Sequence, residues 1–317
     1  MVKTQWLGVA ALLCAASGAM AQDGLIVGFD DTVSGSTIAW IRSGSDWQPL
    51  FQYDSQSADV WGLATDPNTC TLYVASGTVL FKLNPGGPLT LVANITLDGV
   101  NISVVSLAWH DGRLIATRNV TDEGFYSIDA TTGVATRLWT QTVGGFPTSW
   151  DFGGIDSDGT TLYGVTDTAP TGAIRGLYSV DLSGQVLTPI VATPNFAGNT
   201  GTTPDVDGLA IGGGKAFFIP DQPGDIAVFD LASGVFDAPI VNPFPTSEVF
   251  SAGAWAPCFL GTSCDADFNG DTIVDFFDYL DFVAAFAAND PASDFNADTV
   301  VDFFDYLDFV AAFAAGC

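Results

Sequence analysis

Short apolar runs rich in β-branched and aromatic residues alternate with turns of Gly, Asp, Asn and Pro along most of the chain. Runs of this length, bounded by turn residues, are typical of β strands. A sustained helical period of apolar residues appears only near the C-terminus. We therefore predict a mainly β fold, with a β-propeller domain over residues 22–258 and a small α-helical module over residues 259–317.

The strand pattern of the large domain repeats. Residues 61–95, 105–139, 152–191 and 206–241 each contain a strand of small residues, a turn, a second strand, a loop, a third strand and an outer strand. A Gly or Ser marks each first strand, and the markers are Gly62, Ser106, Gly154, Gly208 and Gly253. Their spacings of 44, 48, 54 and 45 residues are those of four-stranded propeller blades.

The fifth unit contains only one strand, over residues 251–257, whereas the N-terminal region supplies three strands without a blade. Joining these four strands completes a blade and closes the ring, so that no strand edge is left open. The sequence therefore predicts five blades, and it resembles secreted propellers with LYxxD-type blades. A β-sandwich is the alternative, but it explains the repeated units poorly.

A second repeat occupies the C-terminus. Residues 267–288, DFNGDTIVDFFDYLDFVAAFAA, recur as residues 294–315 with 20 of 22 positions identical. Each copy predicts a loop followed by a helix, with helices over 276–288 and 303–315. The helices have more apolar surface than one packing face needs, and Phe282 lies outside their two main apolar stripes.

The polar residues of each copy have the spacing of an EF-hand-type Ca²⁺ loop. Such loops offer side-chain oxygens at positions 1, 3, 5, 9 and 12 and a backbone carbonyl at position 7. Two matches predict two Ca²⁺ ions. The predicted ligands are Asp267, Asn269, Asp271, Ile273, Asp275 and Asp278 in the first copy, and Asp294, Asn296, Asp298, Val300, Asp302 and Asp305 in the second.

Position 6 of these loops is normally Gly, because the backbone turns sharply there with positive φ. Thr272 and Thr299 occupy it here. A β-branched residue is poorly suited to that conformation. The sequence therefore predicts a weakened affinity for calcium or an altered local turn.

The duplicated loop and helix, the Asp at position 12 and the Gly-Cys ending resemble a dockerin domain of the Gly-Cys-ended type. The resemblance covers residues 264–317. It implies non-covalent docking to a cohesin-like protein, in either of two orientations because the copies are nearly identical. It also implies that loop positions 10 and 11 contact that partner, and these are Phe276, Phe277, Phe303 and Phe304.

The formal net charge of −28 comes almost entirely from Asp. A surface of this charge repels polyanions, so nucleic acid is excluded as a partner. Residues 1–21 have the pattern of a secretory signal peptide, and their apolar run is too short to span a membrane. We predict a secreted, extracellular protein without membrane insertion, which a docking partner holds at the cell surface.

Four cysteines follow the predicted cleavage site and allow three pairings. Disulfides are expected in an exported chain. We favour one bond between Cys264 and Cys317, which bracket the acidic repeat, and one between Cys70 and Cys258, near the ends of the large domain. A free Cys317 remains the alternative.

Candidate catalytic residues in the large domain are few. His110, the only histidine, is expected in an exposed turn, and no GxSxG motif accompanies it. Glycosidases need two carboxylates across the scissile bond. The candidates are Glu123, Glu248, Asp151, Asp156 and Asp207, but no motif connects them, so we assign no catalytic residue and no organic cofactor.

Four tryptophans could stack on sugar rings or pack between strands: Trp47, Trp61, Trp109 and Trp150. The leading hypothesis is a calcium-dependent dockerin-like module that displays a binding propeller, with polysaccharide as one candidate ligand. The alternative is a polysaccharide-degrading glycoside hydrolase attached through the module. A third hypothesis makes the repeat a calcium-stabilised anchor without a cohesin.

Overall fold

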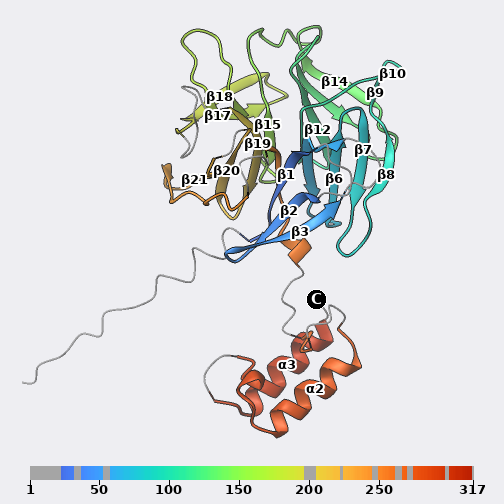
Figure 1. Ribbon diagram of the computed structural model, residues 1–317, viewed down its shortest axis with the longest axis vertical. Helices are drawn as coiled ribbons and strands as arrows, with labels where there is room; N and C mark the ends of the chain where they lie inside the picture. The colour runs from blue at the N-terminus through green and yellow to red at the C-terminus, as the bar shows by residue number, and fades with distance from the viewer. Residues whose placement is uncertain are drawn as a thin grey trace, which may run out of the picture. The chain divides into compact units, whose positions relative to one another are not determined.

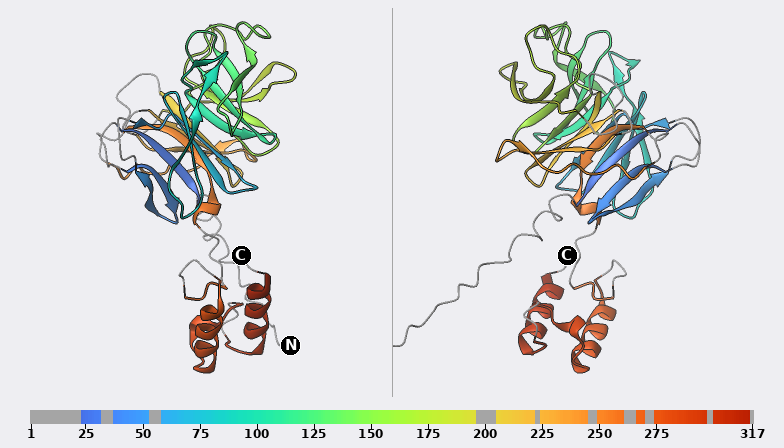
Figure 2. Two further views of the ribbon diagram at one scale, coloured as in Figure 1. Left: turned by 90° about the vertical axis from the view of Figure 1, so that its right-hand side faces the viewer. Right: turned by 60° about the vertical axis from the view of Figure 1, so that its left-hand side comes forward.

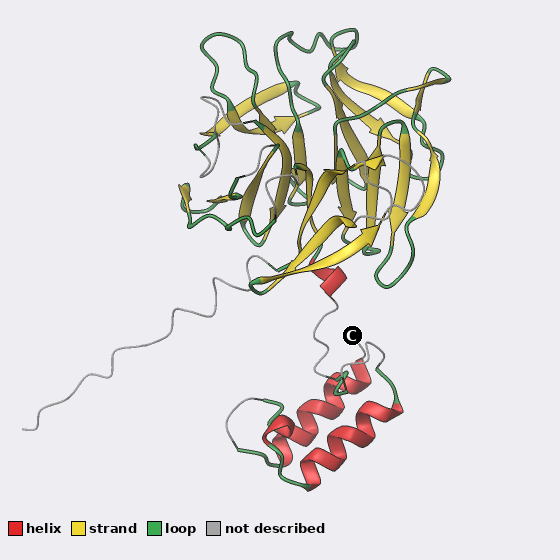
Figure 3. Ribbon diagram, in the orientation of Figure 1, coloured by secondary structure: helices red, strands yellow, loops and turns green. Residues whose placement is uncertain are grey.

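The structure is a computed structural model that describes residues 23–31, 37–52, 58–195, 205–221, 224–244, 249–260, 266–269, 274–296 and 300–315. The chain divides into two compact units, Met1–Ala256 and Pro257–Cys317. The first unit is built of β strands and the second contains the helices α2 and α3 (Figures 1 and 3). The predicted signal peptide lies outside the described residues.

Five antiparallel sheets form the first unit. Blade 1 contains β23 (Phe250–Trp255), β1 (Leu25–Asp31), β2 (Thr37–Ser43) and β3 (Asp46–Gln52). Blade 2 contains β5 (Gly62–Asp66), β6 (Thr71–Ser76), β7 (Val79–Leu83) and β8 (Thr90–Asn94). Blade 3 contains β11 (Ser106–His110), β12 (Arg113–Arg118), β13 (Gly124–Ile128) and β14 (Ala135–Thr140).

Blade 4 contains β15 (Gly154–Ser157), β16 (Leu162–Thr166), β17 (Gly176–Asp181) and β18 (Val186–Ala192). Blade 5 contains β19 (Val206–Gly212), β20 (Lys215–Pro220), β21 (Ala227–Asp230) and β22 (Val235–Phe236). Three short strands lie outside this pattern. These are β4 (Ala58–Asp59), which pairs with β1, and β9 (Thr96–Leu97) with β10 (Val100–Asn101), which pair with each other.

The first strands of the five sheets form the inner ring of a five-bladed propeller. Each inner strand contacts the next, in the order β23, β5, β11, β15, β19 and back to β23. In blade 1, β1 pairs antiparallel with β23, from Leu25 opposite Trp255. Figure 2 shows the first strands of the chain, in blue, and the last strand of this unit, in orange, in the same part of the propeller. The prediction that the N-terminal strands and the last strand share one blade is therefore confirmed.

The Gly and Ser markers of the sequence all lie on inner strands, where neighbouring blades approach closely. A Cβ atom at Gly154 would lie 2.7 Å from the backbone nitrogen of Leu209 on β19. One at Gly208 would lie 2.9 Å from the carbonyl carbon of Ala252 on β23. Small residues recur at one period because the inner strands have little room for side chains there.

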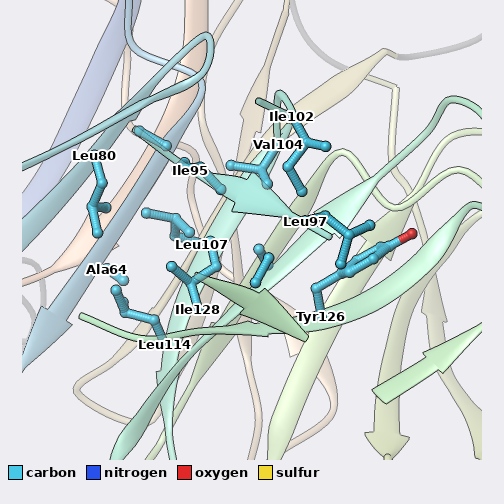
Figure 4. Close-up of a cluster of buried hydrophobic side chains, with 13 residues drawn as sticks. Ala64, Leu80, Ile95, Leu97, Ile102, Val104, Leu107, Leu114, Tyr126 and Ile128 are labelled. Carbon is cyan, nitrogen blue, oxygen red and sulfur yellow. The ribbon is translucent and has the colours of Figure 1, made fainter. Parts of the chain in front are cut away.

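Apolar clusters fill the space between sheets. The cluster in Figure 4 combines residues of blades 2 and 3 with the connection between them. Leu80 and Ile95 belong to it, as do Leu107 and Tyr126, and all four are fully buried. Several inner and second strands are buried on both faces, so their sequences read as continuous apolar runs.

The second unit contains η1 (Pro257–Leu260), α2 (Phe276–Ala287), η2 (Pro291–Ser293) and α3 (Phe303–Ala315). Helix α2 ends one residue earlier than predicted, because Ala288 is its C-cap. Phe282 and Phe309 are fully buried and stack with centroids 3.9 Å apart and planes at 4°. Phe282, outside the apolar stripes in the sequence, is therefore at the centre of this core.

Among the residues that the structure describes, no helix is long and apolar enough to cross a membrane. Cys70 and Cys258 are both disulfide-bonded. The other predicted pair, Cys264 and Cys317, lies outside the described residues.

Candidate functional site

The carboxylates at position 12 of the two predicted calcium loops point into the C-terminal unit. Asp278 and Asp305 are both 0% exposed. Asp278 Oδ1 accepts the backbone N–H of Asn269 at 3.1 Å, and Oδ2 accepts that of Asp275 at 2.8 Å. These two bonds fix positions 3 and 9 of the loop to the first turn of α2.

The second copy repeats this arrangement. Asp305 accepts the backbone N–H of Asn296 at 3.1 Å and that of Asp302 at 2.7 Å. Asp302 in turn accepts the N–H of Phe304 at 2.8 Å, which caps the start of α3. In both loops the buried carboxylate therefore accepts the backbone N–H groups of positions 3 and 9.

Both buried carboxylates are held in the charged form. Burial opposes ionisation of Asp278, but backbone N–H donors outweigh it and hold its pKa below the ordinary value. The pKa of Asp305 is also lowered, chiefly by the N–H of Asp302. Residues 265–316 contain 12 Asp and no Lys or Arg, so this negative charge has no basic side chain within the segment.

The donor set of these loops fits Ca²⁺. Carboxylate, amide and carbonyl oxygens are the ligands that Ca²⁺ prefers. The described predicted ligands are Asp267, Asn269, Asp275, Asp278, Asp294, Asn296, Val300, Asp302 and Asp305, whereas Asp271, Ile273 and Asp298 lie outside the described residues, as do Thr272 and Thr299.

The predicted partner-binding phenylalanines lie on the surface. Phe276, Phe277, Phe303 and Phe304 are 62 to 64% exposed, and Leu280 and Leu307 lie exposed one turn further along. We call these two groups, one on each helix, the Phe-Phe-Leu patches. Exposed apolar groups of this kind mark interaction surfaces.

In the propeller, one end of the inner strands gathers carboxylates. Antiparallel pairing brings the start of an inner strand next to the end of the second strand, and the N–H of Asp221 accordingly donates to the carbonyl of Asp205 at 3.1 Å. We call this end the acidic mouth. It contains Asp151 before β15, Asp167 after β16, Asp205 before β19, Asp207 within β19 and Asp221 after β20.

Crowding and burial make the acidic mouth hard to ionise. One carboxylate oxygen from each of Asp167, Asp205 and Asp207 lies within 4.8 Å of the others. Burial, followed by a hydrogen bond with Asp205, raises the pKa of Asp167 to about 8. Burial, followed by the charge of Asp221, raises that of Asp207 to about 7. Such carboxyl groups hold a proton near neutral pH that they can donate.

The glycosidase candidates are divided between two places. Burial and the nearby Asp151 raise the pKa of Glu123, which therefore interacts with the acidic mouth. Asp151 and Asp207 belong to that mouth, but Asp156 faces a cavity at the opposite ends of the inner strands. Glu248 lies outside the described residues. Asp167, Asp205 and Asp221 were missed because only the pairing of strands brings them together.

The prediction that His110 lies in an exposed turn is wrong. His110 is the last residue of β11 and is partly buried. Its Nδ1 lies 2.9 Å from Ser157 Oγ on the neighbouring blade. Burial is the main cause of its lowered pKa. Ser157 also accepts the N–H of Gly159 at 3.0 Å, so this serine takes part in the turn that follows β15.

A cavity of about 850 Å³ opens where the inner strands turn into the second strands. We call it the turn-side cavity. Each of the five blades contributes lining residues to it, among them Thr65, Trp109, Asp156, Gly212 and Trp255. Trp109 is the one of the four predicted sugar-stacking tryptophans that lines it. Trp47 packs against Phe244, and Trp150 against Phe152.

Comparisons with known proteins place the chain in no family. No family model and no curated protein sequence matches it. Among solved structures, it is similar to a chain of a nidogen/laminin complex, with 12% identity and a TM-score of 0.47, over 74% of this chain and 98% of that one. TolB from Acinetobacter baumannii matches with 12% identity and a TM-score of 0.43, over 79% of this chain and 74% of that one.

The extracellular domain of a one-component system from B. thetaiotaomicron matches with 14% identity and a TM-score of 0.34. That match covers 67% of this chain and 28% of the other.

Proposed function

We propose that this protein is a secreted binding protein in which the C-terminal unit is a dockerin-like module. The module binds two Ca²⁺ ions and docks non-covalently to a cohesin-like partner on a scaffold or cell surface. The propeller is the ligand-binding domain that this docking displays. The observation that carries the proposal is the buried position-12 carboxylate of each loop, ionised in a segment without basic residues.

Calcium, when bound, supplies the positive charge that the loop carboxylates lack. Asp278 and Asp305 would hold it together with the oxygens at positions 1, 3, 5, 7 and 9 of their loops. Each of these two carboxylates also bonds the N–H at position 9, directly before its helix. Ligation and the start of each helix therefore depend on the same side chain, and metal binding is coupled to folding of the module.

The symmetry of the module supports docking in two orientations. Equivalent residues of the two copies contact each other: Tyr279 Oη lies 3.3 Å from Tyr306 Oη, and Phe282 stacks on Phe309. The Phe-Phe-Leu patches have nearly equal exposure in the two copies. A partner that binds the patch and the adjacent predicted calcium loop of one copy would find the equivalent surface on the other copy. It would reach that surface by rotating half a turn relative to the module.

The test measures calcium and docking on the full chain. Calorimetric titration of Ca²⁺ into EDTA-treated protein is expected to give two sites, of which Asp278→Asn removes one and Asp278→Asn with Asp305→Asn removes both. Purified cohesin domains on a sensor surface should then retain the protein in Ca²⁺ and release it in EGTA.

Single-copy variants separate one docking orientation from two. Phe276→Ser with Phe277→Ser is expected to leave docking within about threefold, whereas the same change in both copies should abolish it. Leu91→Ser on β8, an equally exposed apolar residue of the propeller, is the matched control. Absence of calcium binding refutes the metal loops, and calcium binding without any docking favours a calcium-stabilised anchor.

One observation favours an enzymatic alternative. The acidic mouth combines protonated carboxyl groups with neighbouring carboxylates, which is the pairing that glycoside hydrolysis uses. In that case the attached propeller degrades a polysaccharide. Release of reducing sugar from a polysaccharide panel, lost in Asp167→Asn and Asp207→Asn, would support it, and no turnover on the panel would exclude it.

A further inference from the structure

The turn-side cavity presents two tryptophan rings that the fold holds in place. Trp109 stacks on Tyr73 with centroids 5.5 Å apart and planes at 3°. Trp255 stacks on Phe217 at 5.5 Å and 8°. A Cβ atom at Gly212 would lie 2.0 Å from the Trp255 ring, so the ring lies over a position that only glycine can occupy. Both rings are therefore preorganised before any ligand arrives.

Asp156 breaks the repeat of the inner strands at this cavity. Blades 2, 3 and 5 place Ala64, Ala108 and Ala210 two residues after the marker, and blade 4 places Asp156 there. The side chain is 6% exposed and accepts the N–H of Ile211 at 2.7 Å and that of Ser157 at 2.8 Å. A carboxyl group is costly to bury, so its presence at an alanine position points to a role in the cavity.

Of the three aspartates that line the cavity, Asp156 and Asp158 accept hydrogen bonds from groups of the fold, and Asp111 is exposed to solvent. Burial raises the pKa of Asp156 to about 8, so it carries a hydroxyl hydrogen at neutral pH. Thr65 Oγ1 is buried and has no hydrogen-bond partner among the described residues. Asp158 accepts four hydrogen bonds from within its own turn, from Thr160 N and Oγ1, Thr161 N and Tyr163 Oη.

We propose that the turn-side cavity binds a neutral sugar ring, with the C–H face of a pyranose on Trp109 or Trp255 and its hydroxyl groups on Asp156 and Thr65. Flat aromatic faces with a few fixed polar groups suit a ligand that is apolar on one side and polar at its edge. The lining contains no Lys or Arg among the described residues, which disfavours an anionic ligand.

An organic cation is the competing ligand, because aromatic faces also attract ammonium groups. A cation requires free negative charge. Asp156 is protonated, the carboxylate of Asp158 accepts four hydrogen bonds, and the third aspartate of the lining, Asp111, is exposed to water that screens its charge. A neutral sugar requires only hydrogen-bonding groups, which the protonated Asp156 and Thr65 Oγ1 supply. The inference rests on the proposed binding role of the propeller and gives that role a ligand class.

The test is calorimetric titration of the full chain at pH 7 with cellohexaose, xylohexaose, maltohexaose and, separately, choline. Trp109→Ala and Asp156→Ala are each expected to weaken binding of the recognised saccharide at least tenfold. Asp156→Asn, whose amide still donates, should stay within about threefold. Asp156→Ala introduces the alanine that blades 2, 3 and 5 carry at this position and is expected to fold, which circular dichroism checks.

Trp150→Ala, a partly buried tryptophan outside the cavity, is the matched control and should bind as the wild type does. Trp109-dependent binding of choline, saccharide binding that survives both cavity substitutions, or no binding to any of the three saccharides would overturn the proposal. Because every cavity residue belongs to the first compact unit, saccharide affinity should be the same in Ca²⁺ and EGTA. Failure of docking and failure of sugar binding are thus seen independently.

Discussion

Individual acidic residues of this protein differ in whether the fold favours or opposes their charge. Asp278 and Asp305 receive backbone N–H donors and ionise readily in spite of burial. Asp167 and Asp207 are partly buried beside other carboxylates, so the fold favours their protonated forms. The same residue type therefore has opposite preferences for the charged form, set by the burial, donors and charges around it.

We predict that the acidic mouth makes the propeller less stable at alkaline pH. A carboxyl group whose pKa rises on folding stabilises the folded state below its unfolded pKa, and this contribution is lost as the pH rises through the folded value, about 8 for Asp167. Asp167→Asn removes the titrating group. In EDTA, the Tm of the variant should exceed that of the wild type by about 2–4 °C at pH 8.5. This shift corresponds to roughly 1 kcal/mol of unfolding free energy in a domain of this size.

At pH 5 the wild type should match or exceed that variant, since its Asp167 is protonated there. Asp46→Asn, an exposed aspartate of β3, is the control and should give no pH-dependent difference. An equal Tm difference at both pH values would show that the substitution changes packing and not titration.

Spacing alone singled out Asp278 and Asp305, which the structure buries, because the repeat that contains them is local in sequence. It could not identify Asp167 or Asp221, which follow second strands and reach the mouth only through antiparallel pairing. Trp255 was missed for a similar reason: it ends β23, and the inner ring brings it beside residues of four other blades.

Single strands and helices agree closely with their sequence patterns where the pattern reflects how little space a side chain has or which group caps a helix. The inner strands carry Gly or Ser wherever the next inner strand leaves no room. Helices α2 and α3 begin as predicted, because Asp275 and Asp302 accept the N–H groups of their first turns. The pattern of apolar residues in one helix did not predict that Phe282 lies at the centre of the core, because its stacking partner, Phe309, belongs to the other copy of the repeat.

We predict that Gly154→Ala destabilises the propeller by about 1–3 kcal/mol, the usual cost of overpacking a core. Its Cβ would lie 2.7 Å from backbone of β19, which cannot yield without separating blades 4 and 5. Chemical unfolding followed by tryptophan fluorescence measures the change. Gly87→Ala, with ordinary contacts only and no positive φ, should change stability by less than about 0.5 kcal/mol. A similar effect for both glycines would contradict this account.

The whole molecule combines a ring that must close with a helical unit that is compact by itself. Every inner strand contacts an inner strand on both sides, so removing one leaves two others without a packing neighbour. The number and closure of blades could be predicted because they repeat in the sequence. The position of the cavity could not, because it depends on which side chains end the inner strands.

We predict that a chain ending at Leu260 folds with a Tm within about 2 °C of the full propeller, whereas one ending at Val249 does not fold. The shorter chain lacks β23, so it leaves β1 without its pairing partner and leaves β5 and β19 without an inner-ring neighbour. Near-ultraviolet circular dichroism and thermal denaturation distinguish the two. Because the shorter chain also lacks the disulfide-bonded Cys258, the control is Cys258→Ser in the longer chain, which should fold with a lowered Tm. A cooperative transition in the shorter chain would show that β23 is dispensable.

Pairing of β1 with β23 also determines when blade 1 can form during synthesis of the chain. About 200 residues separate the end of β3 at Gln52 from the start of β23 at Phe250. At roughly 5–20 residues per second of synthesis, the first three strands exist for about 10–40 s before their partner is made. Blades 2 to 5 each have all four strands within one continuous segment and can assemble in that interval. The strands that leave the ribosome first are thus the last to complete a blade, and cellular factors that delay their aggregation are expected to act on residues 25–52.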